Sequence, residues 1–250
     1  MQQAADVDPA TNRQVVGAAS HDADLVIWPE AMARDFGEAG SDVSPYAESL
    51  DGAFVEALAA NAGEATVVAG MFERSDDPRR PFNTLVATTK EQLVGSYRKI
   101  HLYDSFGFKE SDVLSKGDLD PQVIDVDGWQ VGLMTCYDLR FPELARALVD
   151  QGAEVLLVPA AWVAGPRKID HWRTLLMARA IENVAYVVAV GQPAPRYCGH
   201  SMLIDPMGEV VVEAPAEGDA VLDAVLQREV LDTARERNPS LSNRRMRPGC

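Results

Sequence analysis

Cysteine is scarce in this chain, with three residues in 250: Cys136, Cys198 and Cys250. So few cysteines exclude the disulfide framework that stabilises many small secreted domains. They fit a reducing compartment, and we therefore expect a cytoplasmic protein. Histidine is almost as rare, with four residues and no metal-ligand spacing among them. We accordingly expect no zinc site and no other bound metal.

Positive charge is also in deficit. Lysine and arginine together number 23 against 38 acidic residues, which gives a net charge of −15 and an isoelectric point near 4.6. So acidic a chain repels nucleic acid and anionic membranes, and we expect neither as a partner. No apolar run approaches the length of a membrane span, and residues 1–6 do not resemble a signal peptide.

The rest of the composition is that of a globular protein, with 47% hydrophobic residues in a chain long enough for a large core. Short apolar strands alternate with helical stretches, and no repeat or linker divides them. This pattern predicts an α/β fold with mixed sheets in one domain spanning residues 1–250. Strands are predicted at 24–29, 65–71, 84–88, 93–98, 122–126, 130–135, 154–160, 186–191, 201–205, 210–213 and 220–225. Helices are predicted at 46–61, 142–151, 168–183 and 228–237, and a turn at Asp127-Gly128.

One predicted strand stops at a cysteine. The apolar residues 131–134 lead to Cys136, and a helix-like run follows at 141–149. A thiol at the carboxyl end of a strand lies where α/β proteins keep their chemistry, and a helix N-terminus beyond it favours the thiolate. A buried structural cysteine is the alternative, and the local sequence does not decide between the two.

Two other predicted strands end in charged residues. The apolar residues 25–28 lead through Pro29 to Glu30, and residues 93–98 lead to Lys99. Taken singly, Glu30 fits an acid at a helix start and Lys99 fits a solvated surface charge. Three strand ends that offer Glu, Lys and Cys in that order are a sharper signal, because together they could form one reactive site.

These motifs resemble those of the carbon–nitrogen hydrolases of the nitrilase superfamily. The matching segments are residues 28–30, 97–104, 136–143, 159–162, 178–183 and 199–208. The resemblance implies the four-layer αββα sandwich of that family, in which two sheets pack face to face with helices outside. It also implies that Glu30 is the general base, Lys99 the oxyanion stabiliser and Cys136 the nucleophile.

The resemblance extends to further site residues. Glu110 matches the second active-site glutamate of the family, and the backbone N–H of Tyr137 is the implied second oxyanion donor. The implied substrate contacts are Tyr103, Phe108, Ala161 and Trp162. The family also implies a small-molecule amide as substrate, no cofactor, and assembly of the chain into a homodimer or a higher homo-oligomer.

The chemistry explains why these residue types are needed. A thiol is a weak nucleophile until a base takes its proton, and Glu30 can do so if burial raises its pKa toward neutrality. The attacked carbonyl oxygen then gains negative charge, which an ammonium and a backbone N–H stabilise. Loss of ammonia leaves a thioester, which water activated by Glu30 can cleave.

Several alternatives stay open at this stage. The motifs look most like the small amidase branch, which includes ω-amidases and deaminated-glutathione amidases, but an N-carbamoyl amino acid hydrolase or a nitrilase uses the same triad. A catalytically silent interaction module could keep the fold. Cys136 could instead pair with His101 or His200. Near the thiol, we interpret Asp138, Arg140 and Glu143 as a structural ion-pair cluster.

The N-terminus departs from the family pattern. Family members begin with a strand that ends in Gln, followed by a helix. Here Gln2 or Gln3 matches that glutamine and a short helix is predicted over residues 12–19, so the first strand is incomplete. Because that strand normally lies beside the one that carries the glutamate, we expect an exposed sheet edge next to the Glu30 strand.

Overall fold

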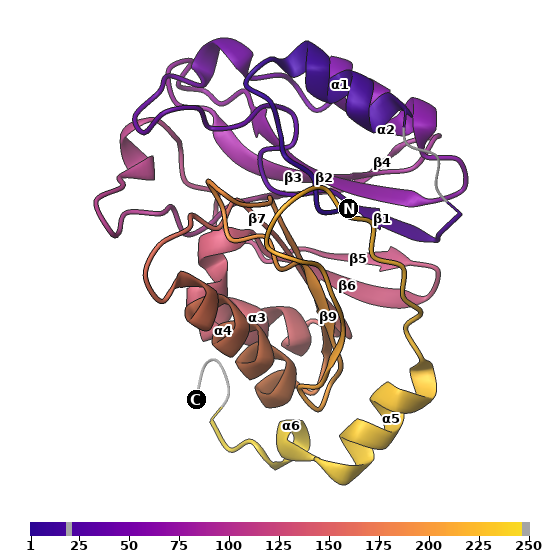
Figure 1. Cartoon of the computed structure of the whole chain (residues 1–250). Helices are drawn as coiled ribbons and strands as arrows, with labels where there is room; N and C mark the ends of the chain where they lie inside the picture. Colours follow the sequence, from indigo (N-terminus) through magenta and orange to yellow (C-terminus); the bar gives the residue numbers. More distant parts are fainter. Residues whose placement is uncertain (19–21, 247–250) are drawn as a thin grey trace.

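Two β-sheets pack face to face in the computed structural model, which describes residues 1–18 and 22–246 (Figure 1). The first sheet runs in the order β1-β2-β3-β4. Its strands are β1 (Leu25–Ile27), β2 (Thr66–Glu73), β3 (Phe82–Thr88) and β4 (Leu93–Arg98). Its outer face is covered by the helices α1 (Pro9–Ala18) and α2 (Ala53–Asn61).

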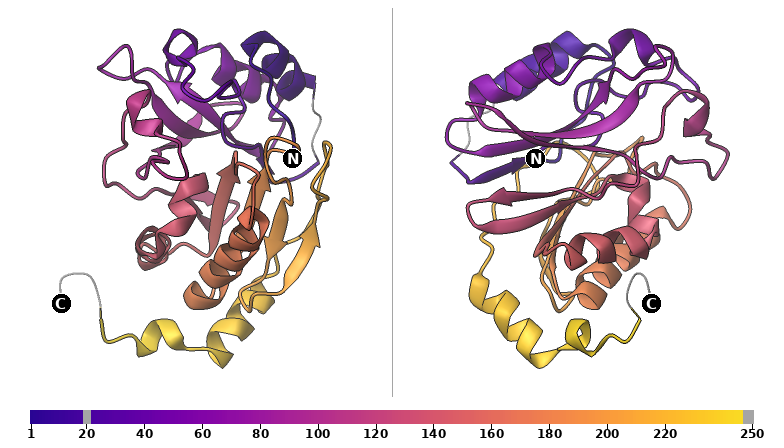
Figure 2. Two further views of the ribbon diagram at one scale, coloured as in Figure 1. Left: turned by 60° about the vertical axis from the view of Figure 1, so that its left-hand side comes forward. Right: turned by 180° about the vertical axis from the view of Figure 1, so that it is seen from behind.

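The second sheet runs in the order β10-β9-β8-β7-β6-β5. Its strands are β5 (Val123–Val126), β6 (Trp129–Leu133), β7 (Val155–Ala160), β8 (Tyr186–Gly191), β9 (Met202–Ile204) and β10 (Val210–Glu213). Its outer face is covered by α3 (Pro142–Asp150) and α4 (Lys168–Asn183), while α5 (Arg228–Arg237) and α6 (Ser240–Asn243) lie at the far end of the molecule (Figures 1 and 2). The layers therefore follow the predicted αββα order.

Strand direction decides where the strand ends meet. In the first sheet β1 is parallel to β2, and β4 is antiparallel to β3, which is itself antiparallel to β2. It follows that β1 and β4 run the same way and end at the same edge. In the second sheet β6, β7 and β8 are parallel to one another. Each sheet thus gathers the ends of its parallel strands at one edge.

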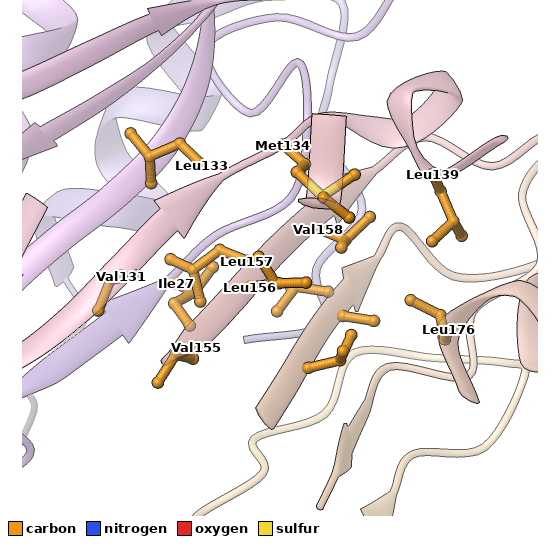
Figure 3. Close-up of a cluster of buried hydrophobic side chains, with 14 of the residues drawn as sticks. Ile27, Val131, Leu133, Met134, Leu139, Val155, Leu156, Leu157, Val158 and Leu176 are labelled. Carbon is orange, nitrogen blue, oxygen red and sulfur yellow. The ribbon is translucent and has the colours of Figure 1, made fainter. Parts of the chain in front are cut away.

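The core lies mainly between the sheets and beneath α3 and α4. Buried side chains from both sheets form one cluster, which includes Ile27 of β1, Val131 of β6 and Leu157 of β7 (Figure 3). Every residue of β2 and of β7 is buried. Both strands are covered on both faces, which is why they are continuous apolar runs rather than alternating patterns.

Two predicted elements are wrong in part. The predicted helix 46–61 begins only at Ala53, because the backbone of Glu48 pairs with Phe72 and Arg74 beside β2. The predicted strand 220–225 is absent from the described chain: Ala220 forms a single bridge with Gln2, and the residues after it are in no strand. The Asp127-Gly128 turn is confirmed, since both residues have positive φ and the flanking strands pair.

The N-terminal segment is anchored by Gln2, which is buried, unlike Gln3. The Gln2 side chain donates to the carbonyls of Pro215 and Gly218 and accepts from Ser201. The predicted helix 12–19 is found as α1, and its last residue, Ala19, lies outside the described residues. Within the described chain β2 is the only strand that pairs with β1. The expected open edge is occupied in part, because the N-terminal ammonium of Met1 donates to the carbonyl of Ile27 in β1 at 2.9 Å.

Candidate active site

Glu30 is held by groups from three different strands or strand ends. Its side chain is 1% exposed. One carboxylate oxygen, Oε1, accepts from Asn83 Nδ2 at 2.8 Å and from Lys99 Nζ at 2.9 Å. The other, Oε2, accepts from the backbone N–H of Ala161 at 2.7 Å. Because Ala161 follows β7, this carboxylate joins the edges of the two sheets.

Gly70 of β2 allows the backbone of the turn at Glu30 to pass close to the β2 backbone. The turn continues through Ala31 with a φ of +56°, a left-handed conformation that L-residues seldom adopt. A Cβ atom added to Gly70 would lie 2.5 Å from the backbone nitrogen of Ala31 and 2.8 Å from Cα of Glu30. Both are rigid backbone atoms, so only glycine fits at this position.

Gly70→Ala is therefore expected to displace the Glu30 turn. We expect a loss of about 1–3 kcal/mol in the free energy of unfolding, together with a fall in kcat of at least about tenfold. Gly17→Ala is a matched control, because its added Cβ meets only ordinary contact with Asn61, at 3.5 Å. Urea unfolding and steady-state kinetics on both variants test this. A fully active Gly70→Ala enzyme would contradict the role given to this crossing.

Lys99 follows β4 and is 2% exposed. Its backbone N–H donates to the carbonyl of Asn83 at 2.8 Å. Its ammonium donates to Glu30 and to both oxygens of Glu110, at 3.1 and 3.0 Å. Burial alone would lower the pKa of Lys99, but the two carboxylates outweigh it and hold that pKa well above its ordinary value. The side chain is therefore charged.

Glu110 opens the short 3₁₀ helix η2 (Glu110–Asp112) and also accepts from the backbone N–H of Tyr103, at 2.5 Å. Burial raises the pKa of Glu110, the Lys99 ammonium lowers it, and the nearby Glu30 raises it further. Asn83, which the sequence analysis missed, donates to both carboxylates, at 2.8 Å to Glu30 and 3.3 Å to Glu110. Asn83 lies just before the strand predicted at 84–88, whereas β3 begins at Phe82. Extending the predicted strand by two residues would have shown an asparagine inside an apolar strand, which is unusual.

Cys136 opens the 3₁₀ helix η3 (Cys136–Arg140) with a φ of +47°. Its thiol lies beside the carboxylate of Glu30, whose charge acts on it. Burial and the Glu30 charge raise the pKa of Cys136 well above its ordinary value, although Lys99 acts in the opposite sense. Burial beside an anion therefore works against the thiolate that the following helix was expected to favour. The helix predicted at 141–149 is α3, which begins only at Pro142, and the effect of a helix dipole falls off within the first turn.

Asp138 ties the cysteine turn to the end of β4. Its carboxylate accepts from Tyr97 Oη at 2.7 Å, from the backbone N–H of Thr135 at 3.0 Å and from that of His101 at 3.1 Å. The prediction of a structural role is confirmed for Asp138. It is wrong for Arg140, which pairs with no carboxylate anywhere in the part of the chain that the structure describes.

The two histidines proposed as alternative partners of the thiol contact other groups. The Nδ1 atom of His101 lies 2.7 Å from Asp138, and that of His200 lies 2.7 Å from Glu213. Within residues 1–18 and 22–246, no group of histidine, cysteine, aspartate and glutamate side chains is arranged to hold a metal ion. Over the same residues, no helix is long and apolar enough to cross a membrane. Cys250 lies outside the described residues.

The predicted substrate contacts fall into two groups. Tyr103 packs against Phe108 and Tyr137, with ring centroids 5.6 and 5.0 Å apart, and accepts a hydrogen bond from Lys168 Nζ at 2.7 Å. Trp162 is buried and donates its indole N–H to the carbonyl of Lys168 at 3.0 Å. Ala161 acts through its backbone: its N–H donates to the carboxylate of Glu30, the predicted general base at the end of β1.

Comparison with known proteins identifies the family. The sequence profile described as carbon-nitrogen hydrolase matches residues 8–236. The chain belongs to the carbon–nitrogen hydrolase family. This carbon–nitrogen hydrolase is 41% identical, over 233 residues, to a protein of Escherichia coli O157:H7 named deaminated glutathione amidase, a match that covers 92% of this chain and 88% of that protein.

Solved structures of related proteins have the same fold. The CN-hydrolase superfamily protein XC1258 of Xanthomonas campestris, which carries an arsenic adduct in its active site, has a TM-score of 0.85 at 28% identity over 99% of this chain and 96% of its own. A nitrilase-superfamily amidase from Nesterenkonia sp. AN1, with acrylamide added to its active-site cysteine, has a TM-score of 0.73 at 26% identity over 87% of each chain. The predicted nitrilase-type fold is confirmed.

Family membership also decides between an enzyme and a silent interaction module. This carbon–nitrogen hydrolase acts on carbon–nitrogen bonds other than peptide bonds, as the family and the amidase names of its relatives indicate. The prediction of an enzyme is confirmed.

Proposed function

We propose that this enzyme hydrolyses a small carboxamide by nucleophilic catalysis from Cys136, through a thioester, and releases ammonia and a carboxylic acid. The observation that carries the proposal is that the Cys136 thiol is buried beside Glu30 and Lys99, whose carboxylate and ammonium lie 2.9 Å apart. Support comes from the deaminated glutathione amidase of E. coli and from the acrylamide adduct on the active-site cysteine of the Nesterenkonia amidase.

The first step is a proton transfer. Because the pKa of Cys136 is raised, the resting thiol is protonated, and Glu30 takes its proton as the sulfur attacks the amide carbon. Glu30 removes the proton during the attack rather than before it. Little thiolate is therefore present in the resting enzyme to react with other electrophiles. The proton passes from the thiol to the neighbouring carboxylate of Glu30.

The attack places negative charge on the carbonyl oxygen. Lys99 has three N–H donors, and in the resting site they contact Glu30 and both oxygens of Glu110. We infer that the oxyanion replaces one of the two Glu110 oxygens as a partner. The second donor is the N–H of Tyr137, in the first turn of η3, where the backbone amides of a helix have no intrahelical acceptor.

The tetrahedral intermediate collapses when protonated Glu30 gives its proton to the leaving nitrogen. Ammonia departs and the thioester remains on Cys136. Glu30 then removes a proton from water, which attacks the thioester and restores the thiol. Glu110 holds Lys99 in place throughout, and Asn83 holds Glu30. We further propose that residues 1–250 act as one hydrolase domain without a metal or organic cofactor. Cytoplasmic location and a homodimer stay predictions.

A trapping experiment tests the thioester. Hydroxylamine added during turnover of an amide is expected to yield a hydroxamate at the expense of the acid, because it attacks the acyl-enzyme in place of water. Ammonia release should continue at the same rate or faster, and EDTA should not change it. Nitriles and N-carbamoyl amino acids serve as comparison substrates. If nitriles or N-carbamoyl amino acids are turned over faster than amides, the enzyme is a nitrilase or an N-carbamoyl amino acid hydrolase rather than an amidase. Inhibition by EDTA that added zinc reverses would contradict the proposed mechanism.

A further inference from the structure

Gln192 joins the turn of the proposed general base to the N-terminal segment. It directly follows β8 and is 1% exposed. Its side-chain amide is bound at both ends: Nε2 donates to the backbone carbonyl of Glu30 at 3.0 Å, and Oε1 accepts from the backbone N–H of Ala5 at 2.9 Å. A buried amide with partners at both ends has a fixed orientation, so Gln192 holds the two segments in a set position relative to each other.

The backbone of Gln192 is itself held at the edge of the second sheet. Its N–H donates to the carbonyl of Ala160 at 3.0 Å, and its carbonyl accepts from the N–H of Gly199 at 3.0 Å. Ala160 ends β7, and the next residue, Ala161, donates its own N–H to the Glu30 carboxylate. The second sheet therefore contacts Glu30 twice, through Ala161 at the side chain and through Gln192 at the backbone.

The turn after Glu30 needs such support. Ala31 has a φ of +56°, a conformation that costs an L-residue free energy and persists only where the surroundings fix it. The peptide plane between Glu30 and Ala31 carries the carbonyl that Gln192 binds. Without that hydrogen bond the plane can rotate, which relaxes Ala31 and moves the Glu30 side chain relative to the Cys136 thiol.

We propose that Gln192 is a positioning residue for the general base: it fixes the peptide plane after Glu30 and so keeps the carboxylate aligned with the Cys136 thiol. This inference rests on the proposed function, because it assumes that Glu30 takes the proton of that thiol. A displacement of about 1 Å in a reacting group can cost about a hundredfold in rate. Gln192 contacts the backbone of Glu30, so its effect should fall on proton transfer rather than on substrate binding.

Gln192→Met removes the hydrogen bonds and keeps a side chain of similar length. We expect kcat to fall by about 10- to 100-fold and KM to change by less than about threefold. Gln2→Met is the matched control. Gln2 is also a glutamine with 1% exposure, but its side chain donates to the carbonyls of Pro215 and Gly218 rather than to Glu30. Gln2→Met should lower the melting temperature and leave kcat close to the wild-type value.

Gln192→Glu supplies a hydrogen bond that depends on pH. When the introduced carboxyl group is protonated, its O–H can donate to the Glu30 carbonyl and its other oxygen can accept from Ala5, whereas the ionised form has no donor for that carbonyl. Burial raises the pKa of such a carboxyl group, so the ratio of the variant kcat to the wild-type kcat should rise at least about fivefold from pH 8 to pH 5.5. The same ratio for Gln192→Met should stay constant. Division by the wild-type kcat removes the titration of Glu30 and Lys99.

A chemical measurement makes the result independent of turnover. Alkylation of Cys136 by iodoacetamide at pH 7 also requires removal of the thiol proton, and mass spectrometry follows it beside the alkylation of Cys198. Gln192→Met should slow the reaction at Cys136 by at least about tenfold and leave that at Cys198 unchanged.

Wild-type kcat and wild-type alkylation of Cys136 in Gln192→Met would overturn the positioning role while leaving the amidase proposal intact. An equal loss of kcat in Gln2→Met would also overturn it, because the effect would then belong to folding. If Gln192→Met does not fold, the pH-dependent rescue of Gln192→Glu decides. If the wild type releases no ammonia from any amide, the amidase proposal fails, and the alkylation rates alone decide whether Gln192 positions the base.

Discussion

Cys136→Ala is expected to abolish ammonia release, with a loss in kcat on the order of 10⁶-fold, because no other group can form the thioester. Folding should be little affected, since alanine keeps the small buried side chain and removes only one sulfur atom. Cys198→Ala is the matched control: both cysteines are 8% exposed, but the Cys198 thiol hydrogen-bonds with the carbonyl of Val163, at 3.9 Å, and not with the proposed catalytic residues.

The two cysteine variants are compared by ammonia release at equal protein concentration and by thermal melting. Cys198→Ala should keep most of the wild-type rate. Turnover near the wild-type rate in Cys136→Ala would eliminate the covalent mechanism, and a matching loss in both variants would assign the effect to packing rather than to chemistry.

Lys99→Met is expected to lower kcat by about 10²–10³-fold and also to cost about 3–5 kcal/mol of stability. The reason is that Lys99 is the ammonium that both Glu30 and Glu110 contact, and methionine would leave the two buried carboxylates facing each other. Lys90→Met is the control, because Lys90 is exposed and pairs with Glu64 at the surface. It should leave both activity and stability nearly unchanged.

The stability loss in Lys99→Met should depend on pH. Without the ammonium, the folded-state pKa of Glu110 rises further above the unfolded value, so the folded variant binds more protons than the unfolded chain. Its stability should therefore increase as the pH falls from 8 toward 5, and the gap to the wild type should narrow. Urea unfolding at both pH values measures this. A gap that is constant with pH would mean that Glu110 does not carry the penalty.

The sequence predicted the catalytic candidates because each one breaks a local rule at a strand end. A carboxylate after Pro29, a cation after an apolar strand and a thiol before a turn are visible without the fold, and the structure brings Glu30, Lys99 and Cys136 together. Asn83 was missed, because an amide within a strand acquires its importance only when two carboxylates from distant segments approach it.

The remaining errors have one physical origin, namely long-range contacts that override local patterns. The segment before α2 is helical in its composition, but Glu48 is drawn into pairing beside β2. Arg140 lies in a run of alternating charges that predicts ion pairs, yet the fold turns it toward aromatic rings. The state of the Cys136 thiol was likewise misjudged, because the depth of burial cannot be read from its neighbours in sequence.

The reactive groups arrive at different times during synthesis. Glu30, Lys99 and Glu110 belong to the first half of the chain, whereas Cys136 follows a strand of the second sheet. A growing chain on the ribosome therefore carries the base and the cation before any thiol has emerged. The sulfur meets its base only when the two sheets close on each other. Chains in which the two sheets fail to pair thus hold a cysteine without its general base, and amide hydrolysis reports that both sheets have paired correctly.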